Sequence, residues 1–152
     1  FSLLNQSVWT YVGRAHYAAG NLPEARKALE RARSRHEWDN IAKLYLGLTL
    51  ARDGDRQRGL QEVETGLRGI DNWLNYIEMN LHRGQFWDPG RDIRNRIEKT
   101  LAMIQSREVS LPELIASGEW VGRELEDEIE RARDDYRRDR DDDDDRDGGD
   151  RT

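Results

Sequence analysis

Residues 9–32 read WTYVGRAHYAAGNLPEARKALERA, and residues 43–66 read KLYLGLTLARDGDRQRGLQEVETG. When the two stretches are aligned at an offset of 34 residues, small residues fall on small ones and bulky apolar residues fall on bulky ones. Chance rarely produces so many matches at one spacing. The chain is therefore expected to contain tandem copies of one structural unit of this length.

Each copy has the pattern of two antiparallel helices joined at a glycine. Apolar residues keep helical spacing on both sides of this glycine, which can adopt the left-handed conformation that ends a helix. Small residues on facing helices allow the two backbones to approach closely. These turn and small positions are Gly13, Gly20, Ala25, Ala32, Gly47, Gly54, Gly59 and Gly66. The sequence therefore predicts an all-α fold of tandem helix-turn-helix repeats.

The first copy resembles a tetratricopeptide repeat. The residues that carry the resemblance are Trp9, Val12, Gly13, His16, Tyr17, Gly20, Ala25, Leu29 and Ala32. The resemblance implies a right-handed α-solenoid with repeats at about residues 6–39 and 40–73. The second copy lacks the leading Trp, and a degenerate third copy is placed at about residues 70–106.

A long C-terminal helix is predicted over residues 110–138. It begins at the capping box Ser110-Leu111-Pro112-Glu113 and continues in an apolar seam with heptad spacing as far as Tyr136. Repeat arrays commonly end in a helix that caps the last repeat, and this role is preferred here. The alternative is that its outer heptads form a docking or dimer helix. Repeats and cap together define a domain over residues 1–138.

The remaining residues, 139–152, form an acidic tail. They contain eight Asp and three Arg, a net charge of -5 out of the total of -6. Such a segment is expected to be solvated and disordered. Asp143, Asp145 and Asp147 match ligand positions of a calcium loop, but the acid that the loop needs at its twelfth position is missing. They are a weak calcium candidate, and no cofactor is predicted.

The composition excludes several classes of protein. Residues 1–138 are nearly neutral and offer no basic face for nucleic acid. There is no apolar run of the roughly 20 residues that a membrane span needs. The sequence starts at Phe1 and has no Cys, which favours a secreted or periplasmic bacterial protein, while a cytoplasmic one stays open.

The resemblance also implies where a partner binds, because the first helices of such repeats line a concave groove. Carried over position by position, the partner-contacting residues are Thr10, Arg14, Tyr17, Ile41, Leu44, Leu48 and Arg52. The middle of this groove is apolar, and an exposed apolar stripe usually marks a contact. Two explanations remain open. Later helices of the chain cover the stripe, or it receives an apolar helix of another protein or of a second copy, giving a homo-oligomer or a filament.

No chemistry of an enzyme is recognisable. None of the three histidines belongs to a metal-binding pair, and no phosphate-binding glycine loop is present. We expect a non-enzymatic scaffold that mediates protein–protein interaction, including self-association. The alternatives are a structural subunit of an extracellular or envelope-associated assembly, and an accessory domain of a larger protein.

Overall fold

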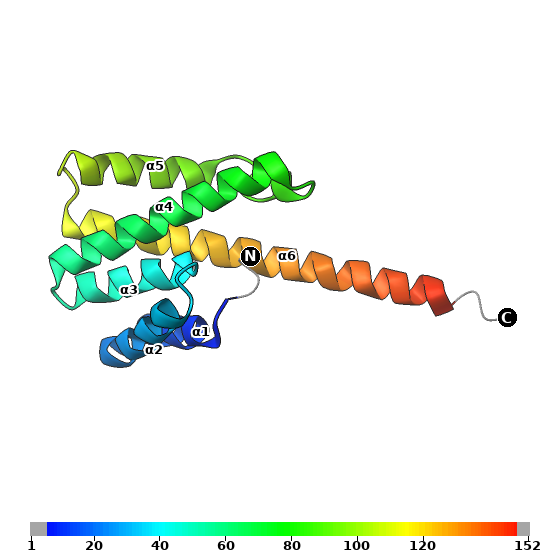
Figure 1. The fold of residues 1–152 in the computed structure, drawn as a ribbon, viewed down its shortest axis with the longest axis horizontal. Coiled ribbons are helices and arrows are strands. Elements are labelled where there is room, and N and C mark those ends of the chain that lie inside the picture. The colour runs from blue at the N-terminus through cyan, green and yellow to red at the C-terminus, as the bar shows by residue number, and fades with distance from the viewer. Residues whose placement is uncertain (1–5, 149–152) are drawn as a thin grey trace.

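Helices and the turns between them account for residues 6–148, the part of the chain that the computed structural model describes (Figure 1). Within this range, the helices are α1 (Val8–Ala18), α2 (Leu22–Arg35), α3 (Asn40–Arg52), α4 (Arg56–Asn80), the 3₁₀ turn η2 (Gly84–Phe86), α5 (Asp92–Gln105) and α6 (Leu111–Gly148). The predicted all-α class is confirmed. Neighbouring helices run in alternating directions, and α3 lies at the centre, in contact with α1, α2, α4 and α6.

The first two helix pairs turn where the sequence predicts. Gly20 follows α1 with φ of 78°, and Gly54 follows α3 with φ of 91°. A side chain at either position would be strained in this left-handed conformation, which glycine adopts without cost. The helix that starts after Gly54 is capped by Asp55, whose Oδ1 accepts a hydrogen bond from the Arg58 backbone N at 3.3 Å. The 34-residue spacing in the sequence is therefore the distance along the chain between two equivalent interhelical turns, one at Gly20 and one at Gly54.

The small residues allow close approach of the paired helices. A Cβ added to Gly47 would lie 2.5 Å from the backbone N of Val63, and one added to Gly66 would lie 2.7 Å from the backbone N of Leu44. In the first pair, a Cβ on Gly13 would lie 2.4 Å from Leu29 Cγ. The second pair is thus in backbone-to-backbone contact, whereas the first is separated by a side chain.

The predicted boundary between the second and third copies, at residues 70–73, is wrong. α4 is a single helix of 25 residues that runs through this boundary. Val63, Ile70 and Ile77 repeat at heptad spacing and are each at most 2% exposed, so one apolar face continues without interruption. No proline or left-handed glycine stands there to end the helix. The same helix therefore pairs with α3 and with α5.

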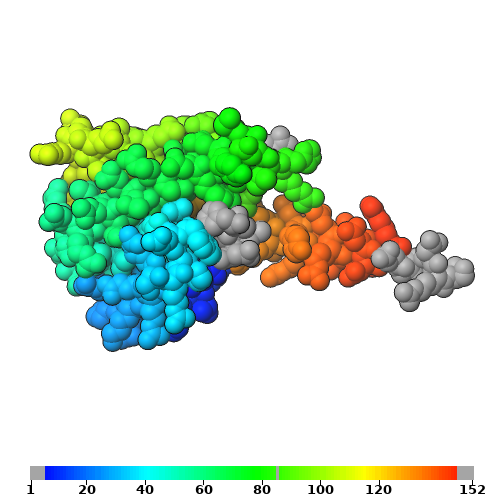
Figure 2. Space-filling model, in the orientation of Figure 1, coloured from blue at the N-terminus to red at the C-terminus, as the bar shows by residue number. Residues whose placement is uncertain are grey.

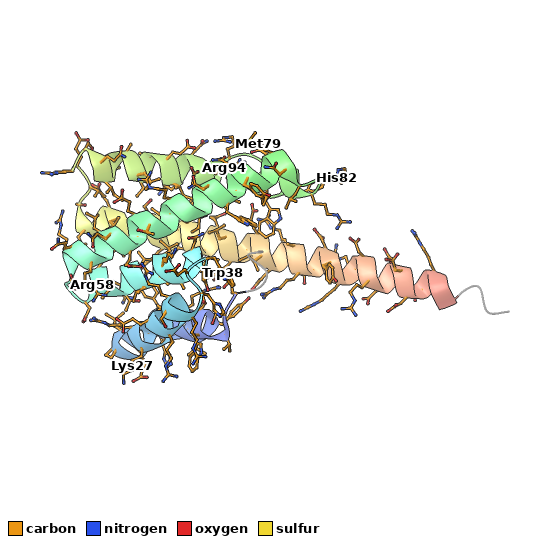
Figure 3. The ribbon with its side chains drawn as sticks, in the orientation of Figure 1. Lys27, Trp38, Arg58, Met79, His82 and Arg94 are labelled. Carbon is orange, nitrogen blue, oxygen red and sulfur yellow. The ribbon has the colours of Figure 1, made fainter. Side chains whose placement is uncertain are left out.

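A buried ion pair holds the connection between α4 and α5. Asp88 accepts hydrogen bonds from the backbone N of Ile93 and of Arg94, each at 3.0 Å, and from Arg94 Nε at 3.0 Å. Arg94 is only 1% exposed and also pairs with Glu78 on α4 (Figure 3). Because each charge is paired and hydrogen-bonded, both can be buried.

α6 begins at the predicted capping box and packs across α3, α4 and α5. The Glu113 backbone N donates to Ser110 Oγ at 3.3 Å. The buried face includes the seam residues Gly118, Gly122, Leu125 and Ile129, but Tyr136 is 59% exposed. The predicted seam therefore packs against the body as far as Ile129, and not at its end.

The tail expected to be disordered from residue 139 is helical as far as Gly148. This part of α6 projects from the body as a narrow rod, and residues 139–146 are exposed (Figure 2). Extending an existing helix costs far less than starting one, because each added residue gains a hydrogen bond. Arg140 and Arg146 also dilute the repulsion within the Asp run. Residues 149–152 lie outside the described part.

Candidate protein-interaction cleft

The apolar stripe of the predicted groove is covered by the chain itself. Ile41, Leu44 and Leu48 are between 0% and 1% exposed. α6 lies over them, and a Cβ on Gly118 would lie 2.7 Å from Leu48 Cδ2 and 3.4 Å from Leu44 Cδ1. The sequence left open whether later helices of the chain or a partner cover the stripe, and these contacts show that a later helix of the chain covers it. These three residues form core and offer no surface to a partner, because the missing side chain of Gly118 lets α6 descend onto α3.

Thr10, another predicted groove residue, is fully buried as well. Its hydroxyl donates to Asp39, and the other carboxylate oxygen of Asp39 accepts from the Ala42 backbone N at 3.0 Å. Asp39 is thus the N-cap of α3 and joins that helix to α1. Thr10 is a structural residue, and its prediction as a partner contact is corrected.

The other three predicted residues, Arg14, Tyr17 and Arg52, come together in a cleft. It lies between α1, α3 and α6 and has a volume of about 760 Å³. We call it the α1–α3–α6 cleft. Its lining residues are Tyr11, Arg14, Ala15, Tyr17, Ala18, Tyr45, Arg52, Glu119, Arg123 and Glu126. What remains open of the predicted concave surface is therefore aromatic and charged, not aliphatic.

Two tyrosines form the floor of the cleft. The Tyr17 hydroxyl donates to Glu119 Oε1 at 2.6 Å, and the Tyr45 hydroxyl donates to Glu126 Oε1 at 2.7 Å. The two rings meet edge to face, with centroids 5.6 Å apart. Burial, followed by the hydrogen bond to the neighbouring carboxylate, raises the pKa of both tyrosines well above the ordinary value. Both hydroxyls are therefore donors that tie α1 and α3 to α6.

Arginines form the walls. Arg14 forms an ion pair with Glu126 at 2.5 Å. Its Cζ also lies near the Tyr11 and Tyr45 rings, 5.4 and 5.6 Å from their centroids. Arg52 Cζ lies 4.8 Å from the Tyr17 ring centroid, a cation–π distance. Because these contacts already hold the guanidinium groups in place, binding a ligand would cost little further side-chain entropy.

Two of the three arginines of the cleft are open to a ligand. Arg14 Nε is buried and has no hydrogen-bond partner among the described residues. Arg123 lies 3.9 Å from Glu119 and is exposed, as is Arg52. The three arginines and two glutamates of the lining leave one positive charge in excess. Fixed guanidinium donors beside aromatic faces suit a ligand that carries carboxylates or carbonyl oxygens next to an apolar group.

Seven of the ten lining residues are not predicted by the sequence. Tyr11 and Tyr45 lie on the predicted first helices but were not singled out there. Glu119, Arg123 and Glu126 belong to α6, about 70 residues beyond α3. Only their i,i+4 and i,i+7 spacing, which places them on one side of a helix, was available as a signal.

The weak calcium candidate does not have the geometry of a calcium loop. Asp143, Asp145 and Asp147 lie within α6, whereas the calcium-binding segment must wrap around the ion as a loop. Within residues 6–148, no group of three or more His, Asp or Glu side chains is placed to hold a metal ion. The acidic run is therefore better described as a charged helix surface.

Comparison of the chain with protein-family models, with curated proteins and with solved structures finds no match. No helix of the described part is long and apolar enough to cross a bilayer. The residues of the cleft and of the surface are thus the basis on which a function is proposed.

Proposed function

We propose that this chain is a non-enzymatic helical-repeat scaffold of the tetratricopeptide type, which binds an acidic segment of another protein in the α1–α3–α6 cleft. The observation that carries the proposal is the cleft itself. It lies on the side of α1 and α3 where such repeats are expected to bind partners. It also presents three arginines, two of which, Arg14 and Arg52, are held beside tyrosine rings.

Two further observations support the scaffold class. The helix pairs α1–α2 and α3–α4 turn at glycines 34 residues apart, and small residues allow each pair to pack closely. No histidine, serine or threonine lines the cleft, and its tyrosines are hydrogen-bonded to carboxylates with pKa values raised by burial. The lining thus lacks the hydroxyl and imidazole groups most often used as nucleophile or general base, and its two glutamates accept hydrogen bonds from the tyrosines.

The structure also allows the kind of partner segment to be described more specifically. An apolar helix, the partner first expected, has no place because α6 occupies the aliphatic stripe. A segment with one or two acidic side chains flanking an apolar or aromatic residue fits the exposed Arg52 and Arg123 together with the tyrosine rings of the same lining.

Site-specific photo-crosslinking tests this proposal. A benzophenone side chain at Ala18, which is exposed and lines the cleft, is compared with one at Ala102, which is exposed on α5 away from it. In an extract of the native source we expect a discrete adduct from position 18, lost on Arg52→Glu and kept on the control Arg58→Glu. Arg58 is exposed near the start of α4 and does not line the cleft (Figure 3). Equal adducts from both positions, or adducts insensitive to Arg52→Glu, would contradict the proposal.

A further inference from the structure

The large exposed apolar side chains of the described residues gather at one end of the molecule. At this end α1 and α3 begin, α2 and α4 end, and η2 follows α4 (Figure 1). The exposed residues there are Val8 (66%), Trp38 (42%), Tyr76 (60%), Met79 (84%), Leu81 (54%) and Phe86 (69%). We call Tyr76, Met79, Leu81 and Phe86, which follow one another along the end of α4 and η2, the apolar end face. The opposite end, with the turns after α1 and α3, exposes no large apolar side chain within residues 6–148.

Side chains of this size are unusual on a free surface when several lie together, and they mark protein contacts. Met79 is the most exposed of them, and Figure 3 shows it at the end of α4 with His82 just beyond. An interaction surface at this end would be separate from the α1–α3–α6 cleft, because the two share no residue.

α6 leaves the body through the same end. Its last contacts with other elements are the hydrogen bond from Arg133 to the Tyr11 hydroxyl and the ion pair of Arg83 with Asp139 at 2.8 Å. Beyond Asp139 the helix continues for nine residues to Gly148, about 13 Å at 1.5 Å per residue. The apolar end face therefore lies beside the root of a projecting helix.

The charge of this helix is divided in two. Residues 131–140 contain five Arg and three Asp, a net charge of +2, whereas residues 141–147 contain six Asp and one Arg, a net charge of -5. A helix whose basic half precedes its acidic half is complementary to a copy of itself only when the two run antiparallel. A parallel pair would place the acidic halves against each other.

We propose that two copies of this chain form a closed dimer in which the last parts of α6, residues 131–148, pair antiparallel and the two apolar end faces meet. This rests on the proposed function in that it names a second copy as one protein partner of the scaffold. The acidic half of one helix lies along the basic half of the other when the helices cross near residues 139–140. The overlap then covers residues 131–148, about 27 Å.

The crossing point and the apolar end face coincide, which is the second, independent support. Asp139, at the crossing, is the residue that Arg83 ties to the turn after α4. A two-fold axis there brings Met79 and Phe86 of one copy close to the same residues of the other. Such an interface is self-complementary and closes after two copies, so it gives a dimer and not the filament that open repeat ends suggest.

Charge exchange tests the antiparallel pairing. One variant carries Arg137→Glu, Arg138→Glu and Arg140→Glu. Its counterpart carries Asp142→Lys, Asp143→Lys and Asp145→Lys. None of these residues contacts the apolar end face, and circular dichroism confirms that helix content is kept. By sedimentation equilibrium at 50 mM salt we expect the wild type to be a dimer, each variant alone to be a monomer, and an equimolar mixture to form a heterodimer.

The dependence of dimerisation on salt concentration and on the residues of the apolar end face provides two further tests. Because the charges are exposed, 500 mM salt should weaken the dimer at least tenfold. Met79→Ser with Phe86→Ser should weaken it by a similar factor at either salt concentration. A monomeric wild type at 0.5 mM protein and low salt, a dimer unaffected by charge reversal, or a mixture that stays monomeric overturns the proposal. Arg52→Glu should leave dimerisation unchanged, so failure of the cleft and failure of the dimer are told apart.

Discussion

α3 and the last part of α6 are helices of similar length in opposite surroundings. In α3, ten of thirteen residues are buried, whereas residues 134–146 of α6 are all exposed. A helix that is apolar on every side has to be enclosed, and one that is polar on every side gains nothing from the core. The comparison separates two roles: α3 determines whether the domain folds, and the end of α6 is free to determine what it meets.

The largest effect is expected from a charge in the enclosed helix. Leu48→Asp places a carboxylate under Gly118 of α6 with no cation beside it. Burying an unpaired charge should cost more than about 4 kcal/mol and unfold the domain. Urea denaturation followed by circular dichroism measures this loss. The matched control Leu48→Met keeps the volume and should cost less than about 1.5 kcal/mol. A folded Leu48→Asp variant of normal stability would mean that α6 does not cover α3.

A smaller effect is expected where backbones touch. In Gly47→Ala the new Cβ would lie 2.5 Å from the Val63 backbone N and 2.9 Å from the Gly59 carbonyl oxygen, neither of which can turn away. The free energy of unfolding should fall by about 1–3 kcal/mol.

Gly118→Ala is the matched control, because its Cβ would meet the mobile end of Leu48. Its strain is offset by a gain of about 1 kcal/mol in helix propensity, so we expect little net change. Chemical denaturation of both variants side by side checks the order, and equal losses would show that the close contact of α3 with α4 has been overestimated.

The next effect depends on pH and lies at the junction of α3 and α6. Tyr45→Phe removes the hydrogen bond to Glu126 and should cost about 1 kcal/mol at pH 7. Burial raises the pKa of Tyr45 in the folded protein, so the folded state holds this proton when the unfolded chain loses it above pH 10. The stability that the wild type draws from this group therefore falls as pH rises through 10, by up to about 1.4 kcal/mol per pH unit.

Thermal unfolding of the wild type and Tyr45→Phe at pH 7 and pH 11 measures this difference. The advantage of the wild type should shrink or reverse at pH 11. An advantage that stays constant across this range would mean that the Tyr45 hydroxyl is not held by burial.

The smallest effect is expected at the projecting helix. Asp143→Asn lies in an exposed segment, so the free energy of unfolding, measured at 500 mM salt where dimerisation is weak, should change by less than about 0.5 kcal/mol. A loss above about 1 kcal/mol would show that this segment packs against the body and would remove the contrast with α3.

Some features follow from local pattern and could be predicted. The turns at Gly20 and Gly54, the close-packed Gly47 and Gly66, and the start of α6 at its capping box depend on residues within one hairpin or one helical turn. Such short-range requirements appear in the residue spacing, and the repeat shows the glycine turn twice. The third repeat was misplaced because its boundary was inferred from similarity, while the uninterrupted apolar face of α4 determines where that helix ends.

By itself, then, the sequence determined that the chain is helical, that it contains two hairpins in a 34-residue register, and that a long helix begins at the capping box at Ser110. The tertiary structure alone decided that α6 fills the apolar stripe of α3 and that its carboxylates meet Tyr17 and Tyr45. It also decided that the exposed apolar residues share one end with the projecting helix. The physical reason is distance along the chain: these contacts join residues about 50 to 100 positions apart, and helical periodicity shows that a face is apolar without showing what covers it.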